Sequence, residues 1–158
     1  KATNQMRNLA IITKDLSPTQ NAFYLIDTLN KVASDNEYNV MCYTNPLLPT
    51  VKAVKFACVS PYYFSSFCGT AVATDIESAK TMLKTNSNIT KFLYLWDIEW
   101  LRSGLGFEEC SAVLRDESLS IIARSESHKK IIENYCNKPV IGILDDWNKE
   151  EMEEILWT

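Results

Sequence analysis

Two carboxylates follow the most apolar run of this sequence at a spacing that suits chemistry on a polar ligand. The run is residues 92–96 (FLYLW), and Asp97 and Glu99 come directly after it. In an extended chain, side chains two residues apart point to the same side. Asp97 and Glu99 can therefore together grip sugar hydroxyls, a metal ion or a proton in transit. Each can equally cap the turn that follows the strand, and the sequence leaves both interpretations open.

A second polar group opens the first expected helix and comprises Ser17, Thr19, Gln20 and Asn21. Exposed N–H groups and the helix dipole make such an end a candidate site for an anion or a hydroxyl group. Ser17 is also a good N-cap, with Pro18 next to it and Gln20 at the capping-box position. Capping alone is the simpler interpretation.

Two more polar turns follow the last two apolar runs. In residues 124–128 (RSESH), Ser125 and Glu126 are candidate ligand contacts, although Ser125 also suits an N-cap. The sole histidine, His128, has no identifiable Ser or Cys partner, so we interpret it as a surface helix residue. In residues 145–147 (DDW), Asp145 either binds a polar ligand or caps the last helix.

Aromatic residues offer a further candidate site, a stacking platform for a sugar or a base. The residues concerned are Tyr62, Tyr63 and Phe64, together with Trp96 and Trp100. Aromatic residues within apolar runs usually belong to the core, which is our interpretation of Trp96. For Tyr62, Tyr63 and Trp100 the sequence does not decide between a stacking platform and the core.

Glycine placement excludes the usual nucleotide-binding loops after the first strand. The chain has four glycines, and the loop KDLSPTQ at residues 14–20 contains none of them. Neither a dinucleotide fingerprint nor a phosphate-binding P-loop is therefore present there. One histidine and five cysteines without CxxC spacing do not form a zinc-binding pattern. We expect no cofactor and no metal.

Strand and helix patterns alternate along the chain and position these residues. Short apolar runs predict strands at residues 9–13, 39–43, 54–59, 69–74, 92–96, 119–123 and 140–144. Helices are predicted from Ser17, from Thr74 (a capping box with Glu77), over residues 107–115, from Ser125, and from Asn148 (a capping box with Glu151). The first carries the clearest apolar stripe, formed by Ala22, Leu25, Ile26, Leu29 and Val32. Phe107 and Ile131 are expected on the buried faces of later helices.

This alternation predicts an α/β fold, a three-layer Rossmann-like domain. We expect a mostly parallel sheet of about six or seven strands with helices on both faces. Loops at the carboxyl ends of such strands are where ligands bind. The length of 158 residues suits one domain, residues 1–158.

Composition and charge indicate which kinds of partner the protein can have and in which cellular compartment it lies. The net charge of −4 argues against a nucleic-acid partner. No apolar run approaches the ~20 residues of a membrane helix, and the N-terminus has no signal-peptide core. We therefore expect no membrane association and a cytoplasmic location. The chain has five cysteines, an odd number, and we interpret them as structural thiols in a reducing compartment.

The order of elements resembles the N-terminal, acceptor-side domain of glycosyltransferases with the two-domain GT-B architecture. An opening strand (LAIIT) leads into a loop and a long helix, and the later strand FLYLW ends in an acidic residue. The most specific part is SLSIIARSESHKKIIENYCNKPVIGILDDW, which reads as strand, Ser-rich turn, helix, strand and Asp-containing turn. The chain departs from the family in lacking glycines after its first strand and a Gly-Val-Asp-like sequence after its last.

The resemblance implies a sugar acceptor that faces the loops around Ser17, Asp97 and Ser125, with Asp97 as the catalytic base. It also implies a separate donor-binding domain that supplies the nucleotide sugar. The alternative is a stand-alone Rossmann-like or flavodoxin-like module that binds a small polar ligand or a partner without catalysis. A small α/β hydrolase ranks last, because the G-x-S-x-G elbow is missing.

Overall fold

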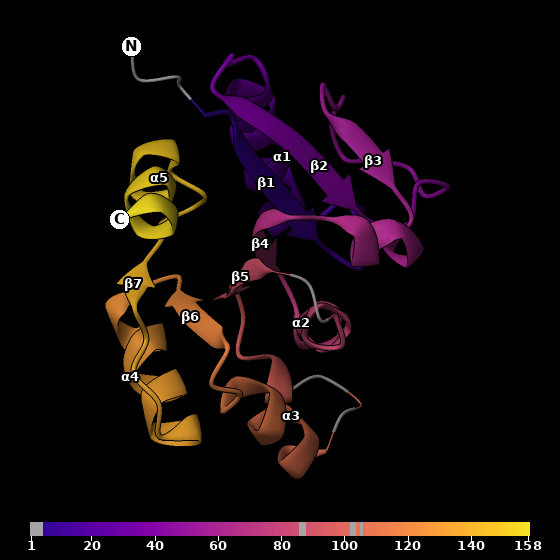
Figure 1. Cartoon of the computed structure of the whole chain (residues 1–158). Coiled ribbons are helices and arrows are strands. Elements are labelled where there is room, and N and C mark those ends of the chain that lie inside the picture. Colours follow the sequence, from indigo (N-terminus) through magenta and orange to yellow (C-terminus); the bar gives the residue numbers. More distant parts are fainter. Residues whose placement is uncertain (1–4, 86–87, 102–103, 105) are drawn as a thin grey trace.

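Seven parallel strands form one sheet in the order β3-β2-β1-β4-β5-β6-β7 (Figure 1). The computed structural model describes residues 5–85, 88–101, 104 and 106–158. The strands are β1 Arg7–Ile12, β2 Tyr38–Tyr43, β3 Ala57–Val59, β4 Gly69–Ala73, β5 Ile89–Leu95, β6 Leu119–Ala123 and β7 Gly142–Ile143. The helices are α1 Gln20–Ala33, α2 Ile76–Leu83, α3 Phe107–Leu114, α4 Glu126–Cys136 and α5 Lys149–Trp157, with 3₁₀ turns η1 Pro61–Ser66 and η2 Glu99–Leu101.

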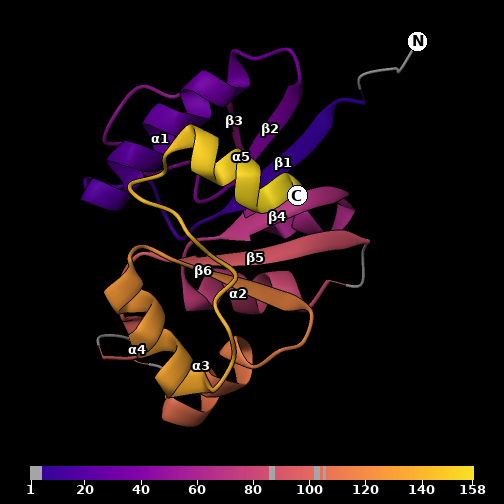
Figure 2. The same ribbon diagram turned by 90° about the vertical axis from the view of Figure 1, so that its left-hand side faces the viewer.

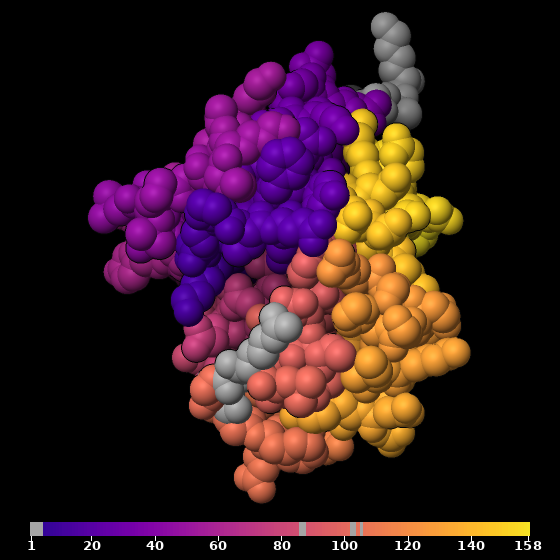
Figure 3. Space-filling model, turned by 180° about the vertical axis from the view of Figure 1, so that it is seen from behind, coloured from indigo at the N-terminus to yellow at the C-terminus, as the bar shows by residue number. Residues whose placement is uncertain are grey.

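Helices cover both faces of the sheet, and alternate residues of the strands form two cores. Leu9 and Ile11 of β1 pack with α1 and α5, whereas Ala10 and Ile12 pack with α2, α3 and α4. Figure 2 shows α5 beside α1, with α2, α3 and α4 grouped on the opposite side. In the space-filling view of Figure 3, α5 (yellow) lies against the N-terminal part of the chain (indigo). The three-layer Rossmann-like fold predicted from the sequence is confirmed.

The order of the strands reverses between β1 and β4. β1 is followed in sequence by β2 on one side, and β4 then lies on the other side of β1. Their register pairs Ile12 with Ala73, so the two strands end level with each other. The loops that begin at Thr13 and Thr74 therefore leave the sheet side by side. This is the switch point at which open parallel sheets bind ligands.

Two predicted helix starts are wrong by one or two residues. Thr19, not Ser17, is the N-cap of α1, and its Oγ1 accepts the Ala22 N–H at 3.1 Å. The N–H and hydroxyl of Ser17 instead bind the Asp15 carboxylate, which fixes a turn before the helix.

In α2 the N-cap is Asp75, not Thr74, and its carboxylate accepts the Ser78 N–H at 2.7 Å. The predicted N-caps Ser125 and Asn148 are confirmed.

Some predicted strand lengths and buried faces are also wrong. β3 and β7 are the two edge strands, and they are shorter than predicted because only three and two of their residues pair with the neighbouring strand. Phe107 and Ile131 are 64% and 42% exposed, not buried. Phe107 begins α3 and contacts the Tyr135 ring edge-on. The sequence also predicts a turn over residues 101–106, and part of that segment lies outside the described residues.

The aromatic segment that the sequence left open forms η1, with Phe64 buried and Tyr62 and Tyr63 exposed. Trp96 is buried, as predicted. Throughout the described ranges, no helix combines the length and apolar character needed to cross a bilayer.

Candidate functional site

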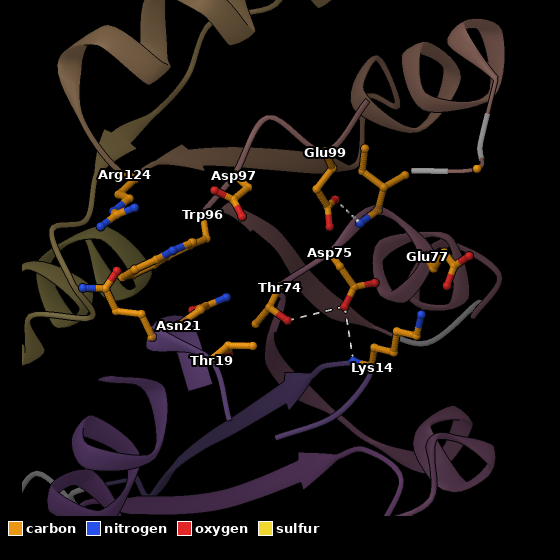
Figure 4. Close-up of a pocket in the computed structure, with 13 residues that line it drawn as sticks. Lys14, Thr19, Asn21, Thr74, Asp75, Glu77, Trp96, Asp97, Glu99 and Arg124 are labelled. Atoms are coloured by element: carbon orange, nitrogen blue, oxygen red, sulfur yellow. Dashed lines mark hydrogen bonds between the residues drawn. The ribbon is translucent and has the colours of Figure 1, made fainter. Parts of the chain in front are cut away.

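A cleft of about 670 Å³ opens at the carboxyl edge of the sheet, over the β1–β4 switch point (Figure 4). Its lining comes from four segments that are far apart in the sequence. They are the loop after β1 with the start of α1, the loop after β4 with the start of α2, the residues after β5, and Arg124 after β6. The parallel topology brings these segments together because every strand ends at this edge.

Hydrogen bonds between the loops after β1 and β4 fix the floor of the cleft. The Asp75 carboxylate accepts the backbone N–H of Lys14 at 3.2 Å, besides capping α2. Beneath it, the hydroxyls of Thr13 and Thr74 are 2.8 Å apart and both residues are buried. These hydrogen bonds join the two loops directly at the base of the cleft.

Glu99 is the side chain of the cleft with the most perturbed acid–base chemistry. It begins η2, and its Oε2 accepts the backbone N–H of Ile76 at 2.7 Å. Burial raises the pKa of Glu99 to about 7; the bond from Ile76 lowers it and the nearby carboxylates Asp75 and Asp97 raise it. The Glu99 carboxyl group therefore exchanges its proton near neutral pH, which a general base requires.

Asp97 lies at the rim of the same cleft, two residues before Glu99. The two side chains are not held by an extended strand, as the sequence spacing predicted, because β5 ends at Leu95 and a bend leads into η2. Asp97 is exposed, whereas Glu99 is partly buried. Figure 4 shows Asp97 beside Trp96 and Glu99 turned toward the start of α2. The bend thus gives two neighbouring carboxylates different environments.

Arg124 and Trp96 form one wall of the cleft. The Arg124 guanidinium carbon lies 3.9 Å from the centroid of the Trp96 ring, and Arg124 also pairs with Asp146 at 3.5 Å. Trp96 is only 7% exposed. A ring so covered offers no face for a stacked sugar, and Arg124 is the group that this wall presents to a ligand.

Asn21 joins the start of α1 to the turn after β7. Its Oδ1 accepts the indole N–H of Trp147 at 2.7 Å, and Trp147 is completely buried. The backbone of this turn is left-handed at both Asp146 (φ 44°) and Trp147 (φ 59°), a strained conformation for residues other than glycine. Thr28 donates to the Trp147 carbonyl at 2.5 Å. Asn21 therefore helps to hold a strained turn behind the cleft.

The structure brings only part of the sequence-predicted site together. Gln20, Asn21, Asp97 and Glu99 line the cleft, whereas Ser17, Ser125, Glu126 and Asp145 are not among its lining residues. Ser17 binds Asp15, Ser125 caps α4, and the Asp145 N–H donates to Glu151 at 2.9 Å. Glu126 is exposed in the first turn of α4.

Sequence reasoning missed Lys14, Asp75 and Glu77, which also line the cleft. Lys14 and Asp75 each stand two residues beyond the end of a strand, β1 and β4. The signal that identifies them is the strand order, because only adjacent strands bring their following loops together.

Acidic groups outnumber basic ones in the cleft. Carboxylates come from Asp75, Glu77, Asp97 and Glu99, and cations from Lys14 and Arg124. Asp75 and Glu99 also accept the N–H groups of the first turn of α2, where a phosphate would otherwise bind. This composition favours a ligand with neutral hydroxyl groups over a phosphate. Within the described ranges, no three His, Cys, Asp or Glu residues are grouped to hold a metal ion.

Comparison with protein-family models, with curated proteins and with solved structures found no match to this chain. The class of protein is therefore defined by the fold and the cleft: a Rossmann-like α/β domain with an acidic cleft at its switch point.

Proposed function

We propose that the cleft binds a small ligand rich in hydroxyl groups and that Glu99 accepts a proton from one of them. In this proposal the domain is the acceptor-side domain of a glycosyltransferase of the GT-B architecture. The observation that carries it is the partly buried Glu99 carboxyl group, which is fixed by the Ile76 N–H and whose pKa burial raises to about 7, in a cleft that Gln20, Asn21 and Asp97 also line.

Sugar transfer to a hydroxyl group requires that the hydroxyl lose its proton as it attacks the sugar. A base with a pKa near the working pH is best matched to this step. Because its pKa lies near 7, Glu99 is partly ionised at neutral pH and can take the proton in that form. Glu99 thus replaces Asp97 as the favoured base, and the exposed Asp97 becomes a hydrogen-bond acceptor for the ligand.

The donor sugar, by this proposal, is held by another domain. The loop after β1 contains no glycine, and α2 already binds Asp75 and Glu99 at its N-terminus, so the cleft offers no usual nucleotide site. All five cysteines lie in the described ranges as thiols. A reducing, cytoplasmic compartment suits such a protein.

A second candidate is a ligand-binding module without catalysis, and one observation favours it. Asp75 and Glu99 both satisfy N–H groups of α2 without any ligand. Such contacts can by themselves account for two carboxylates at this position. The cleft then binds its ligand through the remaining polar groups, and no bond is made or broken.

A transfer assay separates the two candidates. The protein, together with the donor-binding domain that the proposal requires, is incubated with a panel of nucleotide sugars and hydroxylated acceptors, and products are detected by mass spectrometry. We expect transfer, reduced at least ~100-fold in Glu99→Gln and unchanged in the exposed control Glu117→Gln. Saccharide binding without transfer to any acceptor would instead support the non-catalytic module. Equal transfer by Glu99→Gln and the wild type would contradict the role of Glu99.

A further inference from the structure

Two cysteines, Cys42 and Cys58, face each other across neighbouring strands. Cys42 of β2 is the register partner of Cys58 of β3. Both side chains lie on the face of the sheet that α1 covers, Cys42 in the core and Cys58 packed against it. Neighbouring strands are about 4.8 Å apart, and Cα atoms joined by a disulfide are about 4.4–6.8 Å apart. The backbone therefore already holds the pair within bonding range.

The two thiols differ in access and in acidity. Cys42 is completely buried, whereas Cys58 is partly exposed on an edge strand. A hydrogen bond between the thiols raises the pKa of Cys42, as does burial, and the same bond lowers the pKa of Cys58. The thiolate is the nucleophile in thiol oxidation, so Cys58 is the thiol that reacts first.

We propose that Cys42 and Cys58 form an oxidation site that closes to a cross-strand disulfide when the protein meets a peroxide. In the first step the Cys58 thiol attacks hydrogen peroxide, the O–O bond breaks, and a sulfenic acid and one water form. In the second step the Cys42 sulfur attacks the Cys58 sulfur, the S–O bond breaks, and a second water leaves. Peroxide is reduced by two electrons and the thiol pair is oxidised by two.

The disulfide has a definite place in the fold. β3 is an edge strand of three residues, paired only with β2 and followed directly by η1. A bond between Cys42 and Cys58 ties this edge covalently to the second strand of the sheet. Disulfides between directly adjacent strands are strained, and strained disulfides are the readily reduced, regulatory ones. The site is therefore reversible, and it is independent of the chemistry proposed for the cleft.

The test is to map the thiols of the folded, reduced protein before and after treatment with hydrogen peroxide. Remaining thiols are alkylated under denaturing conditions, and the digest is analysed by mass spectrometry. We expect a peptide pair joined through Cys42 and Cys58, the loss of two of the five alkylated thiols, and their full recovery with dithiothreitol. A control variant, Cys68→Ser, removes an exposed cysteine and should give the same cross-linked pair.

Two results would overturn the proposal, and both are obtained with the wild-type protein. One is Cys58 oxidised to a sulfinic acid while Cys42 remains fully alkylated. The other is a disulfide of Cys58 with Cys68, or between two molecules, in place of the Cys42–Cys58 bond. In Cys58→Ser, Cys42 should remain a free thiol after peroxide treatment and should therefore be fully alkylated, because it is buried and has lost its reactive partner.

Discussion

The carboxylate of Glu99 accepts a 2.7 Å hydrogen bond from the backbone N–H of Ile76, so a residue after β5 is fixed to the first turn of α2. This contact holds Glu99 where burial raises its pKa to about 7. A single side chain thus links the sheet, a neighbouring helix and the acid–base chemistry of the cleft. The predictions below separate these contributions.

Glu99 should make stability depend on pH. Its pKa is raised on folding from 4.5 to about 7, so the folded state holds its proton more tightly than the unfolded state. The stabilisation is fully present below about pH 4.5 and is lost as the pH rises through about 7. We expect a loss of roughly 1–2 kcal/mol in the free energy of unfolding, after allowing for partial exposure.

Chemical denaturation at several pH values measures this effect. Glu99→Gln keeps an acceptor for the Ile76 N–H but cannot ionise, so its stability should lack this decline and exceed that of the wild type above pH 7. Glu117→Gln, an exposed carboxylate, should retain the wild-type profile. Parallel pH profiles for the wild type and Glu99→Gln would show that the Glu99 pKa is not raised.

The rate of sugar transfer should follow the ionised form of Glu99. We expect the rate to rise as the pH increases through about 7, because only the carboxylate can accept the acceptor's proton. Values of kcat/KM for product formation, measured from pH 5 to 9, give this profile, because kcat/KM reports the pKa of the ligand-free protein. A rate that falls over the same range would mean that Glu99 acts in its protonated form.

Asp97 should contribute to ligand binding rather than to proton transfer. Asp97→Asn retains a carbonyl oxygen at the rim of the cleft but loses the charge. We expect saccharide affinity to fall by about 10-fold, the effect of one charge-assisted hydrogen bond of ~1.5 kcal/mol. The rate should still rise with pH, but at a slightly lower pH, because the Asp97 charge helps to raise the Glu99 pKa. Isothermal titration calorimetry measures the saccharide affinity, and the transfer rate at several pH values measures the effect on proton transfer. A transfer rate that no longer rises with pH in Asp97→Asn would assign the proton to Asp97 after all.

Asn21 should matter for stability as well as for the cleft. Its side-chain oxygen accepts the indole N–H of the completely buried Trp147. Asn21→Ala leaves that buried donor unsatisfied, so we expect a loss of about 2 kcal/mol in the free energy of unfolding. The control Asn36→Ala, at an exposed position after α1, should cost less than about 0.5 kcal/mol. Equal stabilities of the two variants would contradict the anchoring role of Asn21.

Ser125 should act as a helix cap rather than as a ligand contact. Its Oγ accepts the His128 N–H at 3.2 Å, and it is not among the residues that line the cleft. Ser125→Ala should therefore cost about 1 kcal/mol of stability and leave saccharide affinity unchanged. Thermal unfolding and calorimetry measure both, with the exposed Ser65→Ala as the control. If Ser125→Ala lowers saccharide affinity without lowering stability, Ser125 is a ligand contact and not only a helix cap.

The fold was predictable because its signals are local and agree with one another. The stripe from Ala22 to Val32 is buried as its helical spacing predicted, and Leu119–Ala123 forms β6 with the predicted bounds. Helix starts were less predictable, since several residues in a row can cap. The turn that binds Ser17 to Asp15 moves the start of α1 to Thr19, and this contact leaves no signature in the spacing alone.

The cleft was only partly predictable. Asp97 and Glu99 were identifiable from the sequence because they follow the most apolar strand. The difference in exposure between their side chains depends on the bend after Leu95 and on the contact of Glu99 with α2. Asp75 joins the site only because β4 lies beside β1. Both effects depend on how distant segments pack, which residue types and spacing do not specify.

The most direct test of the central claim is an NMR titration of the folded protein with neutral mono- and disaccharides, monitored through backbone amides. If the cleft recognises hydroxyl groups, we expect saturable shifts concentrated at residues of the cleft, namely Gln20, Asn21, Asp75, Asp97 and Glu99. Inorganic phosphate should give no comparable response. Saturable binding of phosphate at the same residues, with no response to any saccharide, would contradict the claim that this cleft recognises hydroxyl groups.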